Sequence, residues 1–154
     1  MPTADPLTSL VIGDLEATRL TCDLLRRRGH TTVHRAAPTE RELSELLGDH
    51  VDHVVVIVHS DVQALRYVLV VEHLRPGIPL VTTVFDRTVA DQLRRVVPNC
   101  TVTSPADIAA PAIVAASLSE TALAITGAPD HRRLLRRGLD AQGLPAIVTT
   151  AWVD

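Results

Sequence analysis

The stretch VDHVVVIVHSD, residues 51–61, decides the fold class of this chain. Its apolar centre, Val54–Val58, predicts a short strand that is buried on both faces, as the central strands of parallel sheets are. The segment Asp61–Leu74 follows at once and is predicted to be a helix, which the sequence Arg75-Pro-Gly77 ends. A buried strand that leads directly into a helix is the first half of a βαβ unit.

The same alternation extends in both directions from this stretch. The further predicted strands are Ser9–Ile12, Thr31–Arg35, Leu80–Phe85 and Thr101–Thr103, and the further predicted helices are Glu16–Arg28, Pro38–Leu47, Val89–Val96 and Ala106–Leu118. Gly29 is predicted to end the first of these helices, and Thr39 with Glu42 forms a capping box at the second. Because strand and helix alternate five times, the sequence predicts an α/β fold with a doubly wound, Rossmann-like parallel sheet.

The end of the chain is patterned differently. It predicts a strand at Ala122–Thr126, a helix at Asp130–Asp140 and a strand at Ala146–Trp152. We therefore divide the chain into a Rossmann-like domain, residues 1–118, and a C-terminal extension, residues 119–154. This strand-helix-strand extension either adds to the sheet or forms a dimerisation arm that packs on a partner subunit.

Composition excludes several kinds of chemistry. All 15 basic residues are arginines, so Schiff-base catalysis, a phosphate-binding P-loop lysine and a lysine general base are excluded. The lysine that phospho-receiver domains need is absent as well. The net charge of −3 gives no basic field for nucleic acid, and three aromatic residues cannot build a platform for stacking bases. We expect no nucleic-acid partner.

The cysteines and apolar runs indicate the compartment. Cys22 and Cys100 are far apart in the sequence and form no CxxC pattern, so they are expected to be buried, reduced thiols. The first residues show no signal peptide. The most apolar stretches, Val51–Val58 and Ile108–Leu118, are too short to cross a bilayer. We expect a cytoplasmic chain without direct membrane insertion.

Ligands of doubly wound sheets bind at the carboxyl ends of the strands, where the strand order switches. The candidate cofactor-binding residues at these ends are Gly13, Asp14, Leu15, Arg35, His59, Ser60, Asp86 and Arg87. Neighbours in sequence cannot form a catalytic triad, so in His59-Ser60-Asp61 we expect Ser60 or Asp61 to cap the next helix. Asp86 is expected to cap the helix that follows it. No catalytic nucleophile–base pair is predicted.

The first turn departs from the dinucleotide fingerprint G-x-G-x-x-G, which needs glycine at positions 13, 15 and 18. Only Gly13 is present, and Leu15 places a branched side chain where a pyrophosphate would approach. Asp14 adds a negative charge there, which repels phosphate. Arg35 stands where an acidic residue would bind the ribose hydroxyls, and it would suit a 2′-phosphate instead. NAD, another adenine nucleotide or anion, and no nucleotide at all remain open.

The sequence Asp49-His50-x-Asp52-His53 combines residue types that bind metals. It lies in the loop that enters the Val54–Val58 strand, at the opposite end of the sheet from the candidate site. No further ligand is placed to complete a tetrahedral site, so no metal site is predicted.

Several segments together resemble the TrkA-N, or RCK (regulator of potassium conductance), domain. The resemblance extends over about residues 8–118. It rests on Gly13–Thr18 with Leu24-Leu25 and Gly29-His30, and on Val51–Asp61, His73–Pro79, Leu80–Arg87, Ala90–Arg95 and Thr103–Ala112. It implies a Rossmann-like lobe that pairs into dimers and regulates potassium channels and transporters. Members of the family commonly bind NAD, NADH, ATP or similar ligands at the first turn, where this chain departs from the pattern.

The resemblance thus implies a non-catalytic regulatory domain of a potassium or other cation transport system. It implies action by homodimerisation and weak nucleotide sensing, with a membrane channel or transporter subunit as a partner. Two other functions stay open. One is a small oxidoreductase that uses NADP through Arg35, with His59 as its acid or base. The other is a degenerate receiver-like signalling module, which Asp14 suggests and the missing lysine disfavours.

Overall fold

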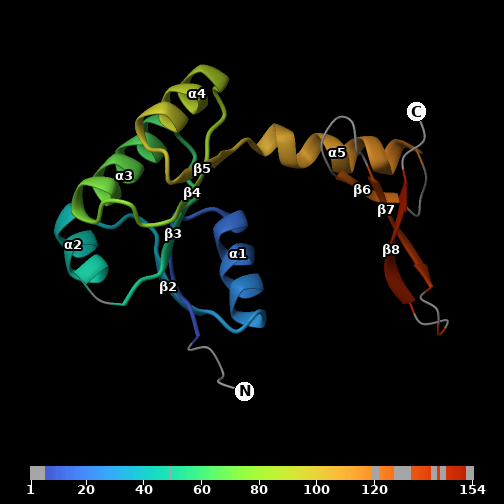
Figure 1. Ribbon diagram of the computed structural model, residues 1–154, viewed down its shortest axis with the longest axis horizontal. Coiled ribbons are helices and arrows are strands. Elements are labelled where there is room, and N and C mark those ends of the chain that lie inside the picture. The colour runs from blue at the N-terminus through green and yellow to red at the C-terminus, as the bar shows by residue number, and fades with distance from the viewer. Residues whose placement is uncertain are drawn as a thin grey trace. The chain divides into compact units, whose positions relative to one another are not determined.

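The computed structural model describes residues 6–48, 50–118, 122–126, 133–139, 142 and 145–151 (Figure 1). Its contacts divide the chain into two compact units, Met1–Ser104 and Pro105–Asp154. The helix that follows Ser104 therefore belongs to the second unit, whereas the sequence pattern grouped it with the first. The limits of the folding domains stay a prediction.

A parallel sheet of five strands, in the order β2-β1-β3-β4-β5, forms the centre of the first unit. The strands are β1 (Thr8–Ile12), β2 (Thr31–Arg35), β3 (His53–Val56), β4 (Leu80–Thr83) and β5 (Cys100–Thr103). The chain leaves β1 towards β2 and returns to β3 on the other side of β1, which makes the switch point of a doubly wound sheet. The predicted α/β, Rossmann-like fold class is confirmed.

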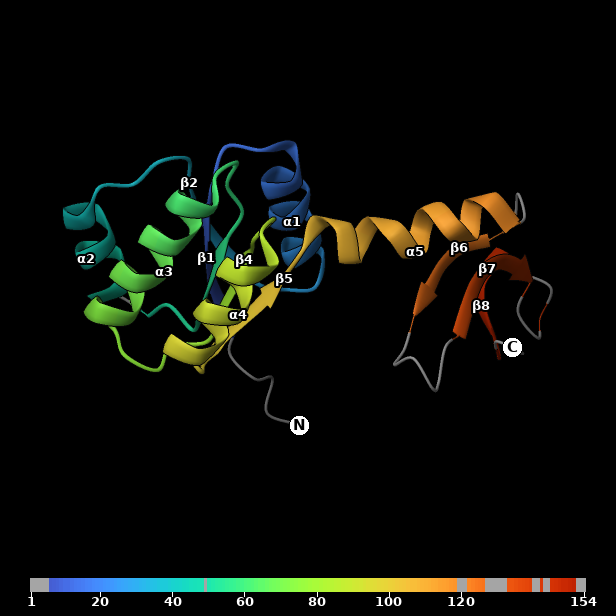
Figure 2. The ribbon, with the colours of Figure 1, turned by 90° about the horizontal axis from the view of Figure 1, so that it is seen from above.

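Helices cover both faces of this sheet (Figure 2). Helix α1 (Glu16–Arg27) lies on one face, and α2 (Glu40–Gly48), α3 (Asp61–Leu74) and α4 (Arg87–Val96) lie on the other. Side chains alternate along β1, so Leu10 and Ile12 join the buried cluster under the three helices, whereas Val11 joins the cluster under α1.

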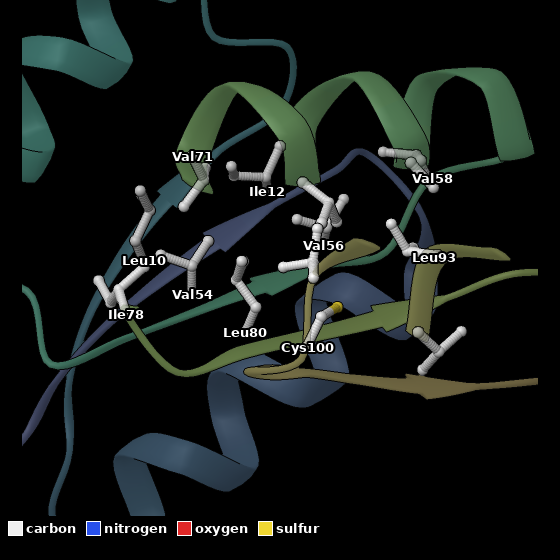
Figure 3. Packing of buried hydrophobic residues seen from close by; sticks show 14 of the residues in the cluster. Leu10, Ile12, Val54, Val56, Val58, Val71, Ile78, Leu80, Leu93 and Cys100 are labelled. Atoms are coloured by element: carbon white, nitrogen blue, oxygen red, sulfur yellow. The ribbon is translucent and has the colours of Figure 1, made fainter. Parts of the chain in front are cut away.

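Branched aliphatic side chains make the larger core. Leu10, Val54 and Leu80 are aligned across β1, β3 and β4, and none is more than 1% exposed. Figure 3 shows these side chains in the layer that Val71 of α3 enters. Burial of each such side chain contributes about 1.5–3 kcal/mol. The sheet is therefore held by valine and leucine packing rather than by aromatic residues.

The predicted helix ends and thiols are confirmed. Thr39 and Glu42 form the capping box, since the Thr39 amide donates to Glu42 Oε2 over 2.7 Å and the Glu42 amide donates to Thr39 Oγ1. Gly29 has a φ of +88° just after α1, a conformation that favours glycine. Cys22 and Cys100 are buried free thiols. Burial, with a smaller effect of the nearby Glu72 carboxylate, raises the pKa of Cys100 to about 11.

The second unit contains α5 (Pro105–Leu118) and an antiparallel sheet in the order β6-β7-β8. Its strands are β6 (Ala122–Thr126), β7 (Arg133–Leu139) and β8 (Pro145–Ala151). The two predicted strands are confirmed, and they form a separate sheet rather than an extension of the parallel one. In the described part of the chain, no helix is long and apolar enough to span a membrane.

The predicted helix at Asp130–Asp140 is wrong, because its described residues, Arg133–Leu139, form the central strand of the second sheet. Arginine and leucine favour a helix, but that preference is a weak effect. Backbone pairing with β6 on one side and β8 on the other outweighs it. The ends of the predicted helix, and Trp152 of the last predicted strand, lie outside the described residues.

The core assignment can be tested with two leucine truncations. Leu10→Ala should lower the free energy of unfolding by about 2–5 kcal/mol, because it leaves a cavity at a fully buried position. Leu24→Ala on α1, where the side chain is 60% exposed, should change it by less than about 0.5 kcal/mol. Urea unfolding measures both values, and equal losses would contradict the assignment.

Candidate functional site

The predicted site residues lie at the carboxyl edge of the five-stranded sheet, where hydrogen bonds join them in two groups. In the first group, the Gly13 amide donates to the Arg35 carbonyl oxygen over 2.9 Å. In the second group, Asp61 at the start of α3 holds the turn after β4, which contains Asp86. The structure thus links the turn after β1 with β2, and the turn after β3 with that after β4.

Gly13 is required by the close approach of two backbone segments. Its φ is +139°, and a Cβ atom built on it would lie 1.8 Å from the Ile57 carbonyl oxygen and 2.9 Å from Thr18 Oγ1. No side chain fits there, whatever ligand is bound. The His34 ring also holds this turn, because its Nε2 donates to the Gly13 carbonyl oxygen over 2.7 Å. The first glycine of the fingerprint therefore packs the turn against the residue that follows β3.

Thr18 occupies the third fingerprint position and takes over part of its packing role. The side chain is fully buried, and its hydroxyl donates to the Ile57 carbonyl oxygen over 3.2 Å. The third glycine normally lets the helix approach the strand closely. Here a hydrogen bond fixes the start of α1 against the end of β3. The sequence pattern marks Thr18 only as a missing glycine and gives no sign of this contact.

Leu15, at the second fingerprint position, is the N-cap residue of α1 and gives the helix no side-chain hydrogen bond. Its half-buried side chain packs on the cluster formed by Val11, Cys22, Val55 and Ile57. The Leu15 side chain is therefore held against the sheet. The fingerprint has a glycine at this position, which lets a pyrophosphate approach the backbone.

The remaining charged residues of the predicted site are exposed. Arg35 donates from Nη1 to the neighbouring His34 carbonyl oxygen over 2.8 Å. The side chains of Asp14, His59 and Arg87 make no hydrogen bond or ion pair with any described residue. The structure therefore does not bring these four side chains together into one polar cluster.

Asp61 links two loops of the carboxyl edge. Its two carboxylate oxygens accept hydrogen bonds from the Phe85 and Asp86 amides, each over 2.8 Å. Either Ser60 or Asp61 was predicted to cap α3. Ser60 is the N-cap residue, but its side chain makes no capping hydrogen bond. The role of Asp61 in joining the β3 and β4 turns was not predicted, because it depends on contacts between distant segments.

Asp86 caps α4, as predicted. Its Oδ1 accepts hydrogen bonds from the Thr88 amide over 2.7 Å and from the Val89 amide over 3.2 Å. These backbone hydrogen bonds hold the pKa of the Asp86 carboxyl below its ordinary value. The Asp86 carboxylate is therefore used to cap the start of α4.

A dinucleotide, the cofactor that the family resemblance implies, fits this turn poorly. Leu15 places a branched side chain at the fingerprint position where the pyrophosphate would approach the backbone. Asp14 and Glu16 place negative charge at the start of α1, and Arg35 replaces the acidic ribose ligand. The first turn thus retains the backbone shape of the fingerprint but not the surroundings that a pyrophosphate needs.

Acid–base chemistry and metal binding would each need side chains brought together at this edge. Asp61 and Asp86 both accept from backbone amides, and exposed His59 has no side chain to orient it among the described residues. In the same part of the chain, no cluster of three or more His, Cys, Asp or Glu side chains could hold a metal ion. Among the described residues, the carboxylates of this edge hold loops and a helix start through backbone hydrogen bonds.

Comparison with known proteins gives a fold relationship. No protein-family model matches the chain, and no curated protein matches it. Among solved structures, the GsuK channel bound to NAD is similar, with a TM-score of 0.62 and 18% sequence identity. The match covers 85% of this chain but only 27% of the channel chain. At this identity, the similarity shows the shared fold alone.

The close approach at Gly13 can be tested by adding one methyl group. Gly13→Ala should lower the free energy of unfolding by about 3 kcal/mol or more, because the new Cβ overlaps the Ile57 carbonyl and the φ is strained. Gly48→Ala is the control, since nothing lies within 4 Å of a Cβ there. It should be neutral or stabilising by up to about 1 kcal/mol. Chemical denaturation of both variants distinguishes these outcomes.

The cap at Asp86 predicts an acid-dependent loss of stability. A carboxyl whose pKa is lowered in the folded state stabilises the fold above its unfolded pKa, and the effect is lost as pH falls through the folded pKa. Asp86→Ala should therefore lower the melting temperature at about pH 7 and converge with the wild type near pH 2–3.

Asp86→Asn, which retains a capping oxygen but no charge, should melt at a temperature less dependent on pH than that of the wild type. Thermal unfolding across this pH range measures both variants. A constant difference between the wild type and Asp86→Ala would contradict the assignment.

Proposed function

We propose that the chain is a non-catalytic regulatory lobe of a potassium or other cation transport system, which acts as a homodimer and binds nucleotides weakly. The observation that carries the proposal is the doubly wound sheet with the Gly13 turn at its switch point. The similarity to a channel solved with NAD and the resemblance to RCK domains support it.

The use of the site's polar groups favours regulation over catalysis. A general base needs a free lone pair and a neighbour that orients it. The carboxylates of Asp61 and Asp86 instead bind consecutive backbone amides and hold the loops in place. An oxidoreductase that uses NADP would need Arg35 to bind a 2′-phosphate and His59 to transfer a proton, and these exposed residues do not contact each other.

Helix α5 supports the homodimer. Asp107 is the only charged residue among its 14 residues, and alanine is the commonest residue in it. Ile108 and Ile113 are 60% and 65% exposed, and Val114 is 46% exposed. Exposed apolar side chains on one helix are typical of a surface that a partner covers, and alanines allow a second helix to approach closely.

The receiver-like alternative keeps one observation in its favour, because β2-β1-β3-β4-β5 is also a strand order of signalling modules. Its chemistry is not supported. The residues that follow β3 directly are Ile57 and Val58, where a phospho-acceptor would need a carboxylate. The first carboxylate after them, Asp61, is bound to backbone amides.

Calorimetry and light scattering on the whole chain test the proposal together. We expect a mass of twice the 16.6 kDa of one chain, and dissociation constants for NAD, NADH, NADP, ATP and ADP weaker than about 0.1 mM. Tight binding of NADP together with turnover would instead establish the oxidoreductase. A monomer at micromolar concentration would contradict the homodimer.

Two arginine substitutions identify the surface that makes the dimer. Ile113→Arg should convert the dimer to a monomer, because it places a charge on the apolar surface of α5. Val62→Arg makes the same change at a 77% exposed position of α3 and should leave the dimer intact. Light scattering measures both masses, and an intact Ile113→Arg dimer would exclude α5 as the contact.

A further inference from the structure

The amino edge of the parallel sheet holds a cluster of polar side chains that the proposed function does not use. Ser9 of β1 is fully buried, and its Oγ lies 3.0 Å from His30 Nδ1. The His30 ring contacts the His53 ring edge to face, with centroids 5.5 Å apart and planes at 86°. Two imidazoles and one hydroxyl therefore meet away from the candidate ligand edge.

The two histidines come from opposite sides of β1. His30 directly precedes β2, whereas His53 is the first residue of β3 and lies beside Ser9 in the sheet register. Because β1 lies between β2 and β3, the ring contact passes over its amino end. The pair thus connects three strands at the point where each of them begins.

Among the described residues, one carboxylate, that of Asp52, acts on His53, and it is already bound to the start of β1. Asp52 Oδ2 accepts from the Thr8 amide over 2.6 Å, and the Asp52 amide donates to the Thr8 carbonyl oxygen over 2.8 Å. The half-buried His53 ring has no hydrogen bond or ion pair among the described residues. A proton added to the His53 ring would therefore place a positive charge beside the His30 ring, and no hydrogen bond or ion pair from a described residue would offset it.

We propose that His30 and His53 form a proton-sensitive latch, in which the neutral pair holds the amino ends of β2 and β3 to β1 and protonation loosens them. The proposal does not depend on the proposed function. It adds a response to mild acid at the edge of the sheet opposite the candidate ligand site.

The direction of the effect follows from linkage. Burial is the main cause that lowers the pKa of His53, the neighbouring His30 lowers it further, and Asp52 opposes them. The unfolded chain then binds a proton at this residue more readily than the folded chain does. The stability that the neutral ring provides is present above the unfolded pKa of about 6.5 and is lost as pH falls through the folded pKa.

Nuclear magnetic resonance on the full chain tests the latch through two readouts. Ring proton shifts should show His53 titrating below its ordinary value. Amide hydrogen exchange, corrected for intrinsic rates, should show that the Asp52 and Thr31 amides, which bond to the start of β1, lose protection at least about threefold between about pH 7.5 and 5.5. The Gly13 amide at the far end of β1 should lose less.

Three asparagine substitutions make the test specific. His53→Asn should abolish the pH-dependent loss of protection, and His73→Asn, at an exposed histidine of α3, should leave it unchanged. His30→Asn leaves His53 in place and should raise the pKa of His53 part of the way to its ordinary value. If His53→Asn does not fold, His30→Asn is the variant that tests the proposal. Ordinary titration of His53 in the wild type, or an undiminished loss of protection in His53→Asn or His30→Asn, would overturn the proposal.

Discussion

The approach of the turn after β1 to the end of β3 is the constraint on which the carboxyl edge of the sheet depends. A Cβ at position 13 would lie 1.8 Å from the Ile57 carbonyl oxygen, so a glycine must stand there. The same carbonyl oxygen accepts a hydrogen bond from the Thr18 hydroxyl, and the Ile57 amide donates to the Ile12 carbonyl oxygen over 2.9 Å. Both backbone polar groups of Ile57, its amide and its carbonyl, are thus bonded within the protein.

This constraint separates two roles of glycine that a nucleotide fingerprint combines. In such a turn, glycine permits a tight backbone path and also opens space for the pyrophosphate. Gly13 serves the first role. At position 15, a leucine packs on the α1 cluster, and at position 18 a threonine bonds to the β3 end. Packing alone therefore requires a glycine at position 13, whether or not a ligand binds.

The fold could be predicted because its signals are local. Buried runs such as Val54–Val56, and the Thr39 and Glu42 capping box, specify strands and helix starts without reference to distant segments. The hydrogen bonds that Asp61 accepts from the Phe85 and Asp86 amides could not be predicted, because they depend on where the turn after β4 lies in space. Strand β7 was mistaken for a helix for the same reason, since its pairing with β6 and β8 is invisible in its own sequence. Gly138, which is unfavourable in a helix, was the available local warning.

The two edges of the sheet differ in the polar groups that hold them. At the carboxyl edge, Asp61 and Asp86 accept hydrogen bonds from backbone amides. At Asp86 these hydrogen bonds hold the pKa of the carboxyl below its ordinary value. At the amino edge the corresponding side chains are the imidazoles of His30 and His53, and burial is the main cause that lowers the pKa of His53. Imidazoles lie at both edges, since His34 donates to the Gly13 carbonyl oxygen and His59 follows β3. The proposed latch belongs to the amino edge, and β1 is the strand that joins that edge to the Gly13 turn.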